Sequence, residues 1–336
     1  MRFSVKLPSY VQIEPVGQCN LRCEMCPIQF RKDGPPYGAL AFMKWETFTS
    51  LLEGFPDLKK IHLQGLGEPM MHPRFFNMVQ YAAGKGIQVT INTNLTLLNP
   101  ERTEQLVKSG LDHLYFSIDG STAETYERIR KRAHYDRVLN NVEMLLETRK
   151  RLNSEFPHLS LVMVIMRQNL HELPDLVKLA HRWSVDKFFV QHLSHDFGEP
   201  TLPEEYRSMR EYVAQQSLVH EDQARINHYF NEAREVAESL GVNLRLPRTT
   251  PRKHEPGTPG KDRCDWPWTG AYISYEGYMM PCCMVSTPDR ANFGKVTEHT
   301  LASVWDGEDY NNFRQQLDSE NPPEICQSCS IYWGVF

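Results

Sequence analysis

Three cysteines on one short segment constrain this chain more than any other feature of its sequence. Cys19, Cys23 and Cys26 are separated by three and then by two residues. An iron–sulfur cluster with four irons is normally held by four cysteine thiolates. With three thiolates, one iron keeps an open coordination position, as the metal of a catalytic zinc site does. The spacing therefore predicts a reactive iron–sulfur cluster, and half of a zinc site is the alternative interpretation.

The composition argues against several classes of protein. The 336 residues carry a net charge of −5 without a long basic stretch, which argues against nucleic acid as the main partner. The mean hydropathy is −0.51, and no apolar run is long enough to span a membrane. The N-terminus lacks the apolar segment of a signal peptide. We therefore expect a cytoplasmic protein without a membrane partner, whose eight cysteines are thiol ligands rather than disulfides.

Short apolar segments alternate with amphipathic helical patterns between residues 11 and 193. Strands are expected at 11–16, 60–64, 88–92, 113–118, 159–166 and 187–193, and helices at 42–54, 73–84, 101–109, 122–150 and 171–183. Six strand–helix units in series imply a parallel sheet with right-handed crossovers. Since a complete barrel needs eight strands, this α/β pattern predicts a partial (β/α)6 TIM-like barrel or an open sheet. Both folds bind ligands at the carboxyl ends of the strands, where the cysteine loop lies.

The pattern changes after residue 195 and divides the chain into three parts. Residues 1–195 form the predicted barrel. Residues 196–262 are predicted to be a helical connector, with a helix that stops near Gly241, followed by a proline-rich linker. Residues 263–336 contain the remaining five cysteines and are predicted to form a small C-terminal domain.

Three further motifs lie at the ends of consecutive predicted strands. They are Gly65-Leu66-Gly67-Glu68-Pro69, Asn92-Thr93-Asn94 and Ser117-Ile118-Asp119-Gly120. Together with the cysteine spacing, they make the chain resemble the radical S-adenosylmethionine (radical SAM) superfamily, whose members have a partial (β/α)6 barrel. The resemblance implies a [4Fe-4S] cluster that binds S-adenosyl-L-methionine (SAM). It also implies cleavage of SAM to a 5′-deoxyadenosyl radical that abstracts a hydrogen atom from the substrate.

The resemblance also assigns residues to the cofactors. Cys19, Cys23 and Cys26 would hold the cluster, and the predicted cofactor-binding residues are Met25, Gly67, Glu68, Asn94, Ser117, Asp119 and Arg130. Glu68 would accept hydrogen bonds from the SAM ammonium, and Ser117 and Arg130 would contact the SAM carboxylate. Met25 stands where the family usually has an aromatic residue next to the adenine. Leu66 and Leu95 replace frequent glycines.

Simpler roles stay open for four of these residues. Glu68, Asn94 and Asp119 could each shape a turn. Arg130 could belong to a solvated basic face over residues 128–132.

Four of the C-terminal cysteines form a second ligand set. Cys264, Cys282, Cys326 and Cys329 are similar to the SPASM domain, a C-terminal extension of radical SAM enzymes. The set resembles the shortened, twitch-like form with one auxiliary [4Fe-4S] cluster, because the further cysteines of the two-cluster form are absent. Four thiolates would close the site, so this cluster would relay electrons or brace the domain. A structural zinc site is the alternative.

Two other residues are candidate catalytic groups. Cys283 is either a small buried thiol or alternate ligand beside Cys282, or a donor of a hydrogen atom to a substrate radical. His192, at the end of the sixth predicted strand, is either a base that faces the substrate or a structural histidine.

The predicted substrate is a small polar molecule that is carbohydrate- or aminocyclitol-like. The one-cluster C-terminal domain resembles that of members that act on such alcohols. The first strand also begins near residue 11, so no preceding domain that grips a leader peptide is expected. Hydrogen abstraction would then lead to dehydrogenation, as in an oxidoreductase, or to epimerisation, with a flavodoxin- or ferredoxin-type electron donor. The alternatives are a maturase of a ribosomal peptide and a non-catalytic metal-binding interaction module.

Overall fold

The structure is a computed structural model that describes residues 5–31, 38–193, 197–250 and 252–334. Its strands are β1 (Tyr10–Ile13), β2 (Lys60–Leu63), β3 (Gln88–Thr93), β4 (His113–Ser117), β5 (His158–Ile165), β6 (Lys187–His192), β7 (Leu244–Arg245), β8 (Gly270–Ile273) and β9 (Met279–Met280). Its longer helices are α1 (Trp45–Gly54), α2 (Phe75–Gly84), α3 (Pro100–Lys108), α4 (Ala123–Ile129), α5 (Tyr135–Arg151), α6 (Leu173–Arg182), α7 (Arg207–Gln216), α8 (Gln223–Leu240) and α12 (Glu308–Leu317). Four short helices belong to the C-terminal part, namely α9 (Gly260–Arg263), α10 (Trp266–Thr269), α11 (Leu301–Trp305) and α13 (Glu324–Gln327).

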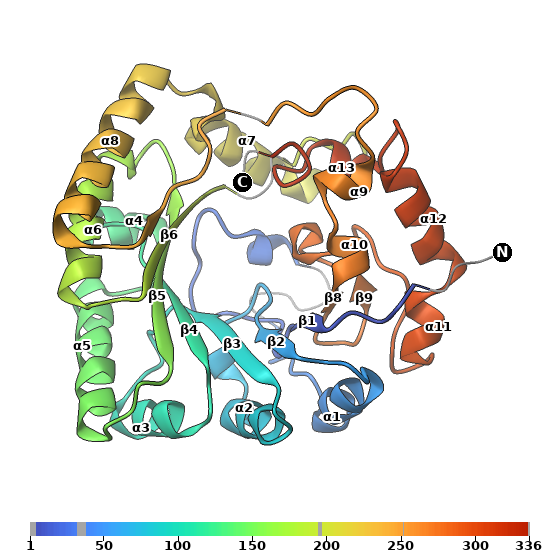
Figure 1. The fold of residues 1–336 in the computed structure, drawn as a ribbon, viewed down its shortest axis with the longest axis horizontal. Helices are drawn as coiled ribbons and strands as arrows, with labels where there is room; N and C mark the ends of the chain where they lie inside the picture. The colour runs from blue at the N-terminus through green and yellow to red at the C-terminus, as the bar shows by residue number, and fades with distance from the viewer. Residues whose placement is uncertain (1–4, 32–37, 194–196, 251, 335–336) are drawn as a thin grey trace.

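The described strands form one sheet in the order β7-β6-β5-β4-β3-β2-β1-β8-β9. Strands β1 to β6 follow one another in chain order and pair in parallel. Helices α1, α2, α3, α5 and α6 lie around the outside of this curved sheet (Figure 1). The predicted partial (β/α)6 barrel is therefore confirmed.

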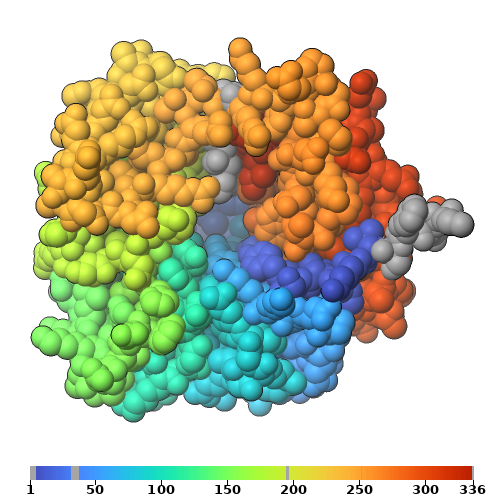
Figure 2. Space-filling view, viewed as in Figure 1, coloured from blue at the N-terminus to red at the C-terminus, as the bar shows by residue number. Residues whose placement is uncertain are grey.

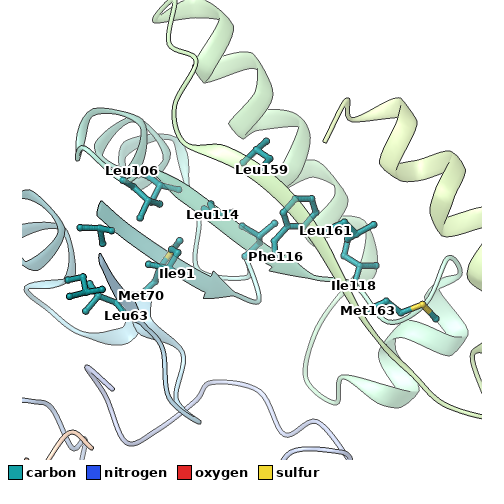
Figure 3. Packing of buried hydrophobic residues seen from close by; sticks show 14 of the residues in the cluster. Leu63, Met70, Ile91, Leu106, Leu114, Phe116, Ile118, Leu159, Leu161 and Met163 are labelled. Atoms are coloured by element: carbon teal, nitrogen blue, oxygen red, sulfur yellow. The ribbon is translucent and has the colours of Figure 1, made fainter. Parts of the chain in front are cut away.

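The outer face of the barrel strands is apolar, because successive residues of a strand point to opposite faces of the sheet. The fully buried side chains of this face include Leu63, Ile91, Leu114, Phe116, Leu161 and Met163. Figure 3 shows these side chains as a continuous layer across neighbouring strands. Burying each of them stabilises the fold by about 1.5–3 kcal/mol. The core therefore lies between the sheet and its helices and leaves the inner face available for polar residues.

The inner face of the same strands is polar. The register places Thr90 beside His113 and Asn92 beside Tyr115 on neighbouring strands. His62 Nδ1 lies 2.8 Å from the Thr90 hydroxyl in the same layer. Figure 2 shows the molecule hollowed at its centre, inside the ring that the barrel and the C-terminal segments form. This arrangement can admit a polar substrate to the interior of the barrel.

The helix expected over residues 122–150 is two helices, α4 and α5. The chain turns between them because Arg130 points inward and forms an ion pair with Asp119. Arg132, in the same turn, has a left-handed backbone conformation with φ 75°. A buried charge pair thus interrupts a segment whose local pattern is helical throughout.

Two parallel strand pairings were not predicted. In the connector, β7 pairs in parallel with β6, with Leu244 opposite Phe188. In the C-terminal domain, β8 pairs in parallel with β1, with Ile273 opposite Ile13. The C-terminal domain therefore extends the barrel sheet beside the strand that leads to the cysteine loop.

Gly241 ends α8 with φ 69°, the left-handed conformation typical of a helix stop.

Buried polar contacts also fix the C-terminal domain to the segment after β6. Glu199 and Arg290 form an ion pair in which the side chains are 5% and 2% exposed. The Tyr206 and Thr287 hydroxyl oxygens lie 3.0 Å apart.

No helix in the described ranges is both long and apolar enough to cross a membrane.

Candidate active site

The cysteine loop follows β1 and packs against the loop that follows β2. The Glu68 amide donates a hydrogen bond to the Gln18 carbonyl oxygen at 3.0 Å. A Cβ atom at Gly67 would lie 2.1 Å from the Val16 carbonyl oxygen, so only glycine allows this approach of the two backbones. Gly67 therefore brings the Glu68 side chain beside the cysteine loop.

Cys19, Cys23 and Cys26 are partly buried, and their thiols are close enough to interact electrostatically. Burial raises the pKa of Cys19, and the neighbouring Glu68, Cys23 and Cys26 raise it further. Burial likewise raises the pKa of Cys23 to about 12. Thiolates buried this close together need a positive charge to offset their repulsion and their loss of hydration. The three thiols therefore fit an iron–sulfur cluster.

Asn94 reaches the first of these thiols. Its side-chain amide donates to Cys19 Sγ at 3.7 Å, and the Leu21 amide donates to the same sulfur at 3.4 Å. Two further hydrogen bonds orient the Asn94 side chain. Asn94 Nδ2 donates to Asn20 Oδ1 at 3.1 Å, and the backbone amide of Thr96 donates to Asn94 Oδ1. Hydrogen bonds to ligand sulfurs tune the reduction potential of a cluster. The geometry therefore offers Asn94 a role beyond shaping the turn.

The Glu68 carboxylate is 3% exposed and held by three donors. Glu68 Oε1 accepts from the Thr93 hydroxyl at 2.8 Å and from the Met70 amide at 3.2 Å. Glu68 Oε2 accepts from the Asn94 amide at 2.8 Å. Burial raises the pKa of Glu68, and these hydrogen bonds act in the opposite direction. The carboxylate thus caps a short turn of helix, and it is also preorganised to receive a cation.

Asp119 and Arg130 form a buried ion pair, with Arg130 Nε 2.7 Å from Asp119 Oδ2. The Arg130 side chain is 8% exposed, so the alternative of a solvated basic face is wrong. The second carboxylate oxygen of Asp119 accepts from the Val164 amide at 2.8 Å. Burial raises the pKa of Cys23 and the charge of Arg130 lowers it. The Glu24 amide donates to the Ile129 carbonyl oxygen at 3.1 Å, so the residue before Arg130 packs on the cysteine loop.

Met25 and His192 line one cavity of about 60 Å³. His192 Nε2 lies 2.7 Å from the Arg248 carbonyl oxygen, so Nε2 carries the proton and donates it. His192 Nδ1 is then an acceptor, and it is buried without a hydrogen-bond partner within the described ranges. Burial lowers the pKa of His192 and favours this neutral form.

Ser117 lies inside the barrel at the end of β4. Its hydroxyl donates to Asn92 Oδ1 at 3.1 Å. Among the described residues no hydrogen bond joins Ser117 to Arg130, so these two predicted partners of the SAM carboxylate are not brought into contact.

A buried ion pair that sequence reasoning missed connects the loops of this site. Arg31 Nη1 and Nη2 lie 2.5 Å and 2.7 Å from the two carboxylate oxygens of Glu14, and both side chains are fully buried. Glu14 also accepts from the amides of Leu66 and Tyr275, at 3.0 Å and 3.3 Å. It therefore joins the cysteine loop, the Glu68 loop and the C-terminal domain. The acid at the end of an apolar strand was a usable signal, whereas nothing in the sequence marks Arg31 as its partner.

The second cysteine set lines an apolar cavity in the C-terminal domain. The thiols there belong to Cys264, Cys282, Cys326 and Cys329. Burial raises the pKa of Cys264 to about 11. In the described ranges no three His, Cys, Asp or Glu side chains are arranged to hold one metal ion. The ligands of a four-iron cluster bind different irons and stand farther apart, so the apolar cavity with four thiols fits such a cluster.

Cys283 does not line that cavity. Burial raises the pKa of Cys283 to about 12, and the nearby thiols of Cys329 and Cys264 act in the same direction. Cys283 also lies near Tyr10 of β1. Burial raises the pKa of Tyr10, and the Cys283 thiol adds a smaller effect in the same direction. Cys283 is therefore beside the auxiliary site, toward the barrel.

Substitution of two adjacent cysteines should separate a ligand from its neighbour. Cys282→Ala is expected to remove the iron of the auxiliary site, about four atoms per chain, because the apolar cavity offers the fourth iron no replacement ligand. Cys283→Ala should retain that iron, since Cys283 lies outside the cavity. Iron assay of the anaerobically reconstituted variants measures both. Equal iron loss in the two variants would contradict the assignment.

Two family models match the chain. The radical SAM superfamily matches residues 13–180, and the iron–sulfur cluster-binding domain SPASM matches residues 264–330. The chain therefore belongs to the radical SAM superfamily and carries a SPASM domain. Its cofactors are accordingly SAM, a [4Fe-4S] cluster and an auxiliary iron–sulfur cluster.

The relatives extend over nearly the whole chain. The chain is 27% identical over 340 residues to the tungsten-containing aldehyde ferredoxin oxidoreductase cofactor-modifying protein of Pyrococcus furiosus, which covers 96% of this chain and 87% of the relative. It is 26% identical over 339 residues to the PqqA peptide cyclase of Xanthomonas euvesicatoria, and the match covers 97% of this chain and 82% of the relative. The fold is similar to that of Streptococcus suis SuiB bound to precursor peptide SuiA, with TM-score 0.68 and 18% identity over 98% of this chain and 71% of SuiB.

These relatives contradict the prediction of a carbohydrate- or aminocyclitol-like substrate. One of them is named as a peptide cyclase and another as a cofactor-modifying protein. The predicted small-molecule partner is wrong on the same evidence. The prediction depended on the start of the first strand near residue 11 and on the number of C-terminal cysteines. Cysteine number reports how many clusters a domain holds but not the shape of the substrate site.

Proposed function

We propose that this chain is a radical SAM enzyme that modifies a peptide. One observation carries the proposal, namely the match of PqqA peptide cyclase to 97% of the chain. The match includes the connector and the C-terminal domain as well as the barrel.

In this proposal the residues around the cysteine loop hold SAM against the cluster. Cys19, Cys23 and Cys26 are the cluster ligands. Glu68 accepts hydrogen bonds from the SAM ammonium, for which its buried carboxylate is preorganised. Arg130, oriented by Asp119, contacts the SAM carboxylate. When bound and reduced, the cluster supplies the electron that cleaves SAM to the 5′-deoxyadenosyl radical.

Met25 and His192 serve the adenine in this proposal. The cavity that they line is mostly apolar, which suits a flat ring, and the thioether of Met25 is polarisable enough to pack against it. His192 Nδ1 accepts a hydrogen bond from the adenine amine, because Nε2 is committed to the Arg248 carbonyl oxygen. His192 is then a positioning residue rather than a base.

The products expected from a peptide are a crosslink or an oxidised side chain. Either outcome removes two hydrogen atoms from the peptide, one to 5′-deoxyadenosine and one as a proton and an electron. The cavity lined by Cys264, Cys282, Cys326 and Cys329 would hold the cluster that accepts this electron. A flavodoxin- or ferredoxin-type protein supplies the first electron.

The Glu68→Gln variant is expected to bind SAM about 10- to 100-fold more weakly, because a charge-assisted hydrogen bond contributes about 1.5–3 kcal/mol. The amide of glutamine also cannot accept at both positions that Glu68 uses. Calorimetric titration of the reconstituted protein with SAM measures the change. Thr93→Val, which removes one donor to Glu68 but retains the charge, is the control and should have a smaller effect. Equal affinities of Glu68→Gln and the wild type would contradict the assigned role.

Incubation with peptides tests the function itself. The reconstituted enzyme, dithionite and SAM are combined with short peptides encoded by open reading frames next to its gene. Loss of two hydrogen atoms from one peptide, with formation of 5′-deoxyadenosine, is the expected result in mass spectrometry. Formation of 5′-deoxyadenosine without a mass change in any peptide would contradict the proposal.

A further inference from the structure

A groove of about 470 Å³ lies between α7, the turn that follows it and the C-terminal end of the chain. Figure 1 shows α7 and the described C-terminal end close to each other on one side of the molecule. Val213 and Val219 line the groove from the α7 side, and Ser328 and Trp333 line it from the C-terminal domain. We call it the α7 groove.

The two walls of the α7 groove are held in place by buried contacts. The Glu199–Arg290 ion pair joins the segment before α7 to the C-terminal domain. Ser328, in the far wall, donates to Glu199 Oε2 at 3.4 Å. The Trp333 indole N–H donates to the Gln327 carbonyl oxygen, which fixes the ring. The groove is therefore preformed, and a ligand would bind it at a low cost in conformational entropy.

Exposed apolar side chains gather in this groove. Val219 and Trp333 are 49% and 43% exposed. Among the described residues only Leu40 and Phe156 are other large hydrophobic side chains with comparable exposure, and neither lines the groove. A concave surface with an exposed tryptophan is typical of a protein or peptide interaction site.

The charge of the α7 groove is opposite to that of the whole chain. The chain has a net charge of −5, yet Arg210 lines the groove and no carboxylate is among its described lining residues. Arg210 donates to the Gly198 carbonyl oxygen at 2.8 Å through one of its five N–H groups. The groove therefore favours an occupant that combines apolar and acidic side chains.

The α7 groove is adjacent to the cavity that contains Met25 and His192. Leu193 and Val213 line both the α7 groove and the cavity that contains Met25 and His192. A chain bound in the groove would thus lie beside the site where SAM is proposed to bind. This proximity favours a substrate segment over an unrelated partner.

We infer that the α7 groove binds an extended segment of the peptide substrate, with apolar side chains against Val219 and Trp333 and an acidic side chain at Arg210. The inference depends on the proposed function and adds to it the chemistry of the peptide. The remainder of the peptide continues past Leu193 to the reaction site. An extended chain also leaves its backbone groups accessible to the serine hydroxyls of the wall.

Selection from a displayed library of random 12-residue peptides tests the inference. The SAM-bound, reconstituted full chain is the target, and the dissociation constants of selected peptides are then measured by fluorescence anisotropy. The Val219→Ser/Trp333→Ser variant should bind these peptides at least tenfold more weakly, because it removes both apolar contacts. Phe156→Ser, which removes an equally exposed ring outside the groove, should bind them as the wild type does.

Charge reversal provides a second, independent measurement. Peptides selected on the wild type should contain aspartate or glutamate. The Arg210→Glu variant should bind these peptides more weakly, and it should bind more tightly the same peptides with lysine at the acidic positions. Circular dichroism and the urea midpoint check that each variant folds. Peptides that bind the wild type and the groove variants equally would overturn the inference and leave the proposed function intact. Failure to select any peptide would also overturn the inference, and the incubation with peptides described above tests the proposed function separately.

Discussion

Replacement of Cys19, Cys23 and Cys26 together by alanine should abolish 5′-deoxyadenosine formation and lower the iron content from about eight to about four atoms per chain. The three thiols share one loop, and no other described cysteine lies with them. Loss of the triplet therefore removes the site to which SAM would bind, while the auxiliary thiols keep their own cavity. Chromatographic detection of 5′-deoxyadenosine and an iron assay measure the two effects.

The complementary variant is the control for this result. Replacing Cys264, Cys282, Cys326 and Cys329 by alanine should also lower the iron content to about four atoms, but the SAM-binding cluster should remain. The absorption or electron paramagnetic resonance spectrum of that variant should still change when SAM is added. If SAM changes the spectrum of the triplet variant instead, the assignment of the two sites is wrong.

The Arg31→Met variant is expected to lose about 3–5 kcal/mol of stability, the cost of leaving a buried carboxylate without its partner. Arg31 and Glu14 are both fully buried. Without the guanidinium, the two amides that still donate to Glu14 do not balance its negative charge. The guanidinium also lies 4.8 Å from the centre of the Tyr275 ring, so the contact to the C-terminal domain weakens as well. Urea unfolding of the apoprotein measures the loss.

Two variants show whether the loss arises from burial of the charge. Glu14→Gln/Arg31→Met should recover part of the stability, because an uncharged glutamine can remain buried and still accept from the Leu66 amide. Asp57→Asn breaks the exposed pair with Lys6, whose side chain is 81% exposed, and should leave the unfolding curve unchanged. A stability of Arg31→Met equal to that of Asp57→Asn would contradict the role of the buried pair.

The barrel was predictable because its signals are local. Each strand has alternating or continuous apolar residues, and each motif follows its strand directly, so one pass along the sequence orders β1 to β6. The break between α4 and α5 was missed, since the local pattern over 122–150 is helical and the cause is a partner eleven residues away, Asp119. The substrate class was predicted wrongly, because cysteine number does not describe the substrate site.

The parts of the candidate site differ in the same way. Glu68 and Asp119 were identified from motifs, but the donors that hold Glu68 and the partner of Asp119 appear only in the structure. The α7 groove had no sequence signal, because Val219 and Trp333 are more than a hundred residues apart and each is unremarkable by itself.

The sequence by itself determined the class of this protein, since three thiolates on one loop must lie close together whatever the rest of the chain does. Only the tertiary structure decided how the site is supported. Glu14 meets Arg31, Leu66 and Tyr275, and β8 pairs with β1, through contacts that span up to 261 residues. Such contacts depend on the burial of whole elements rather than on local propensity, so no single stretch of sequence contains them.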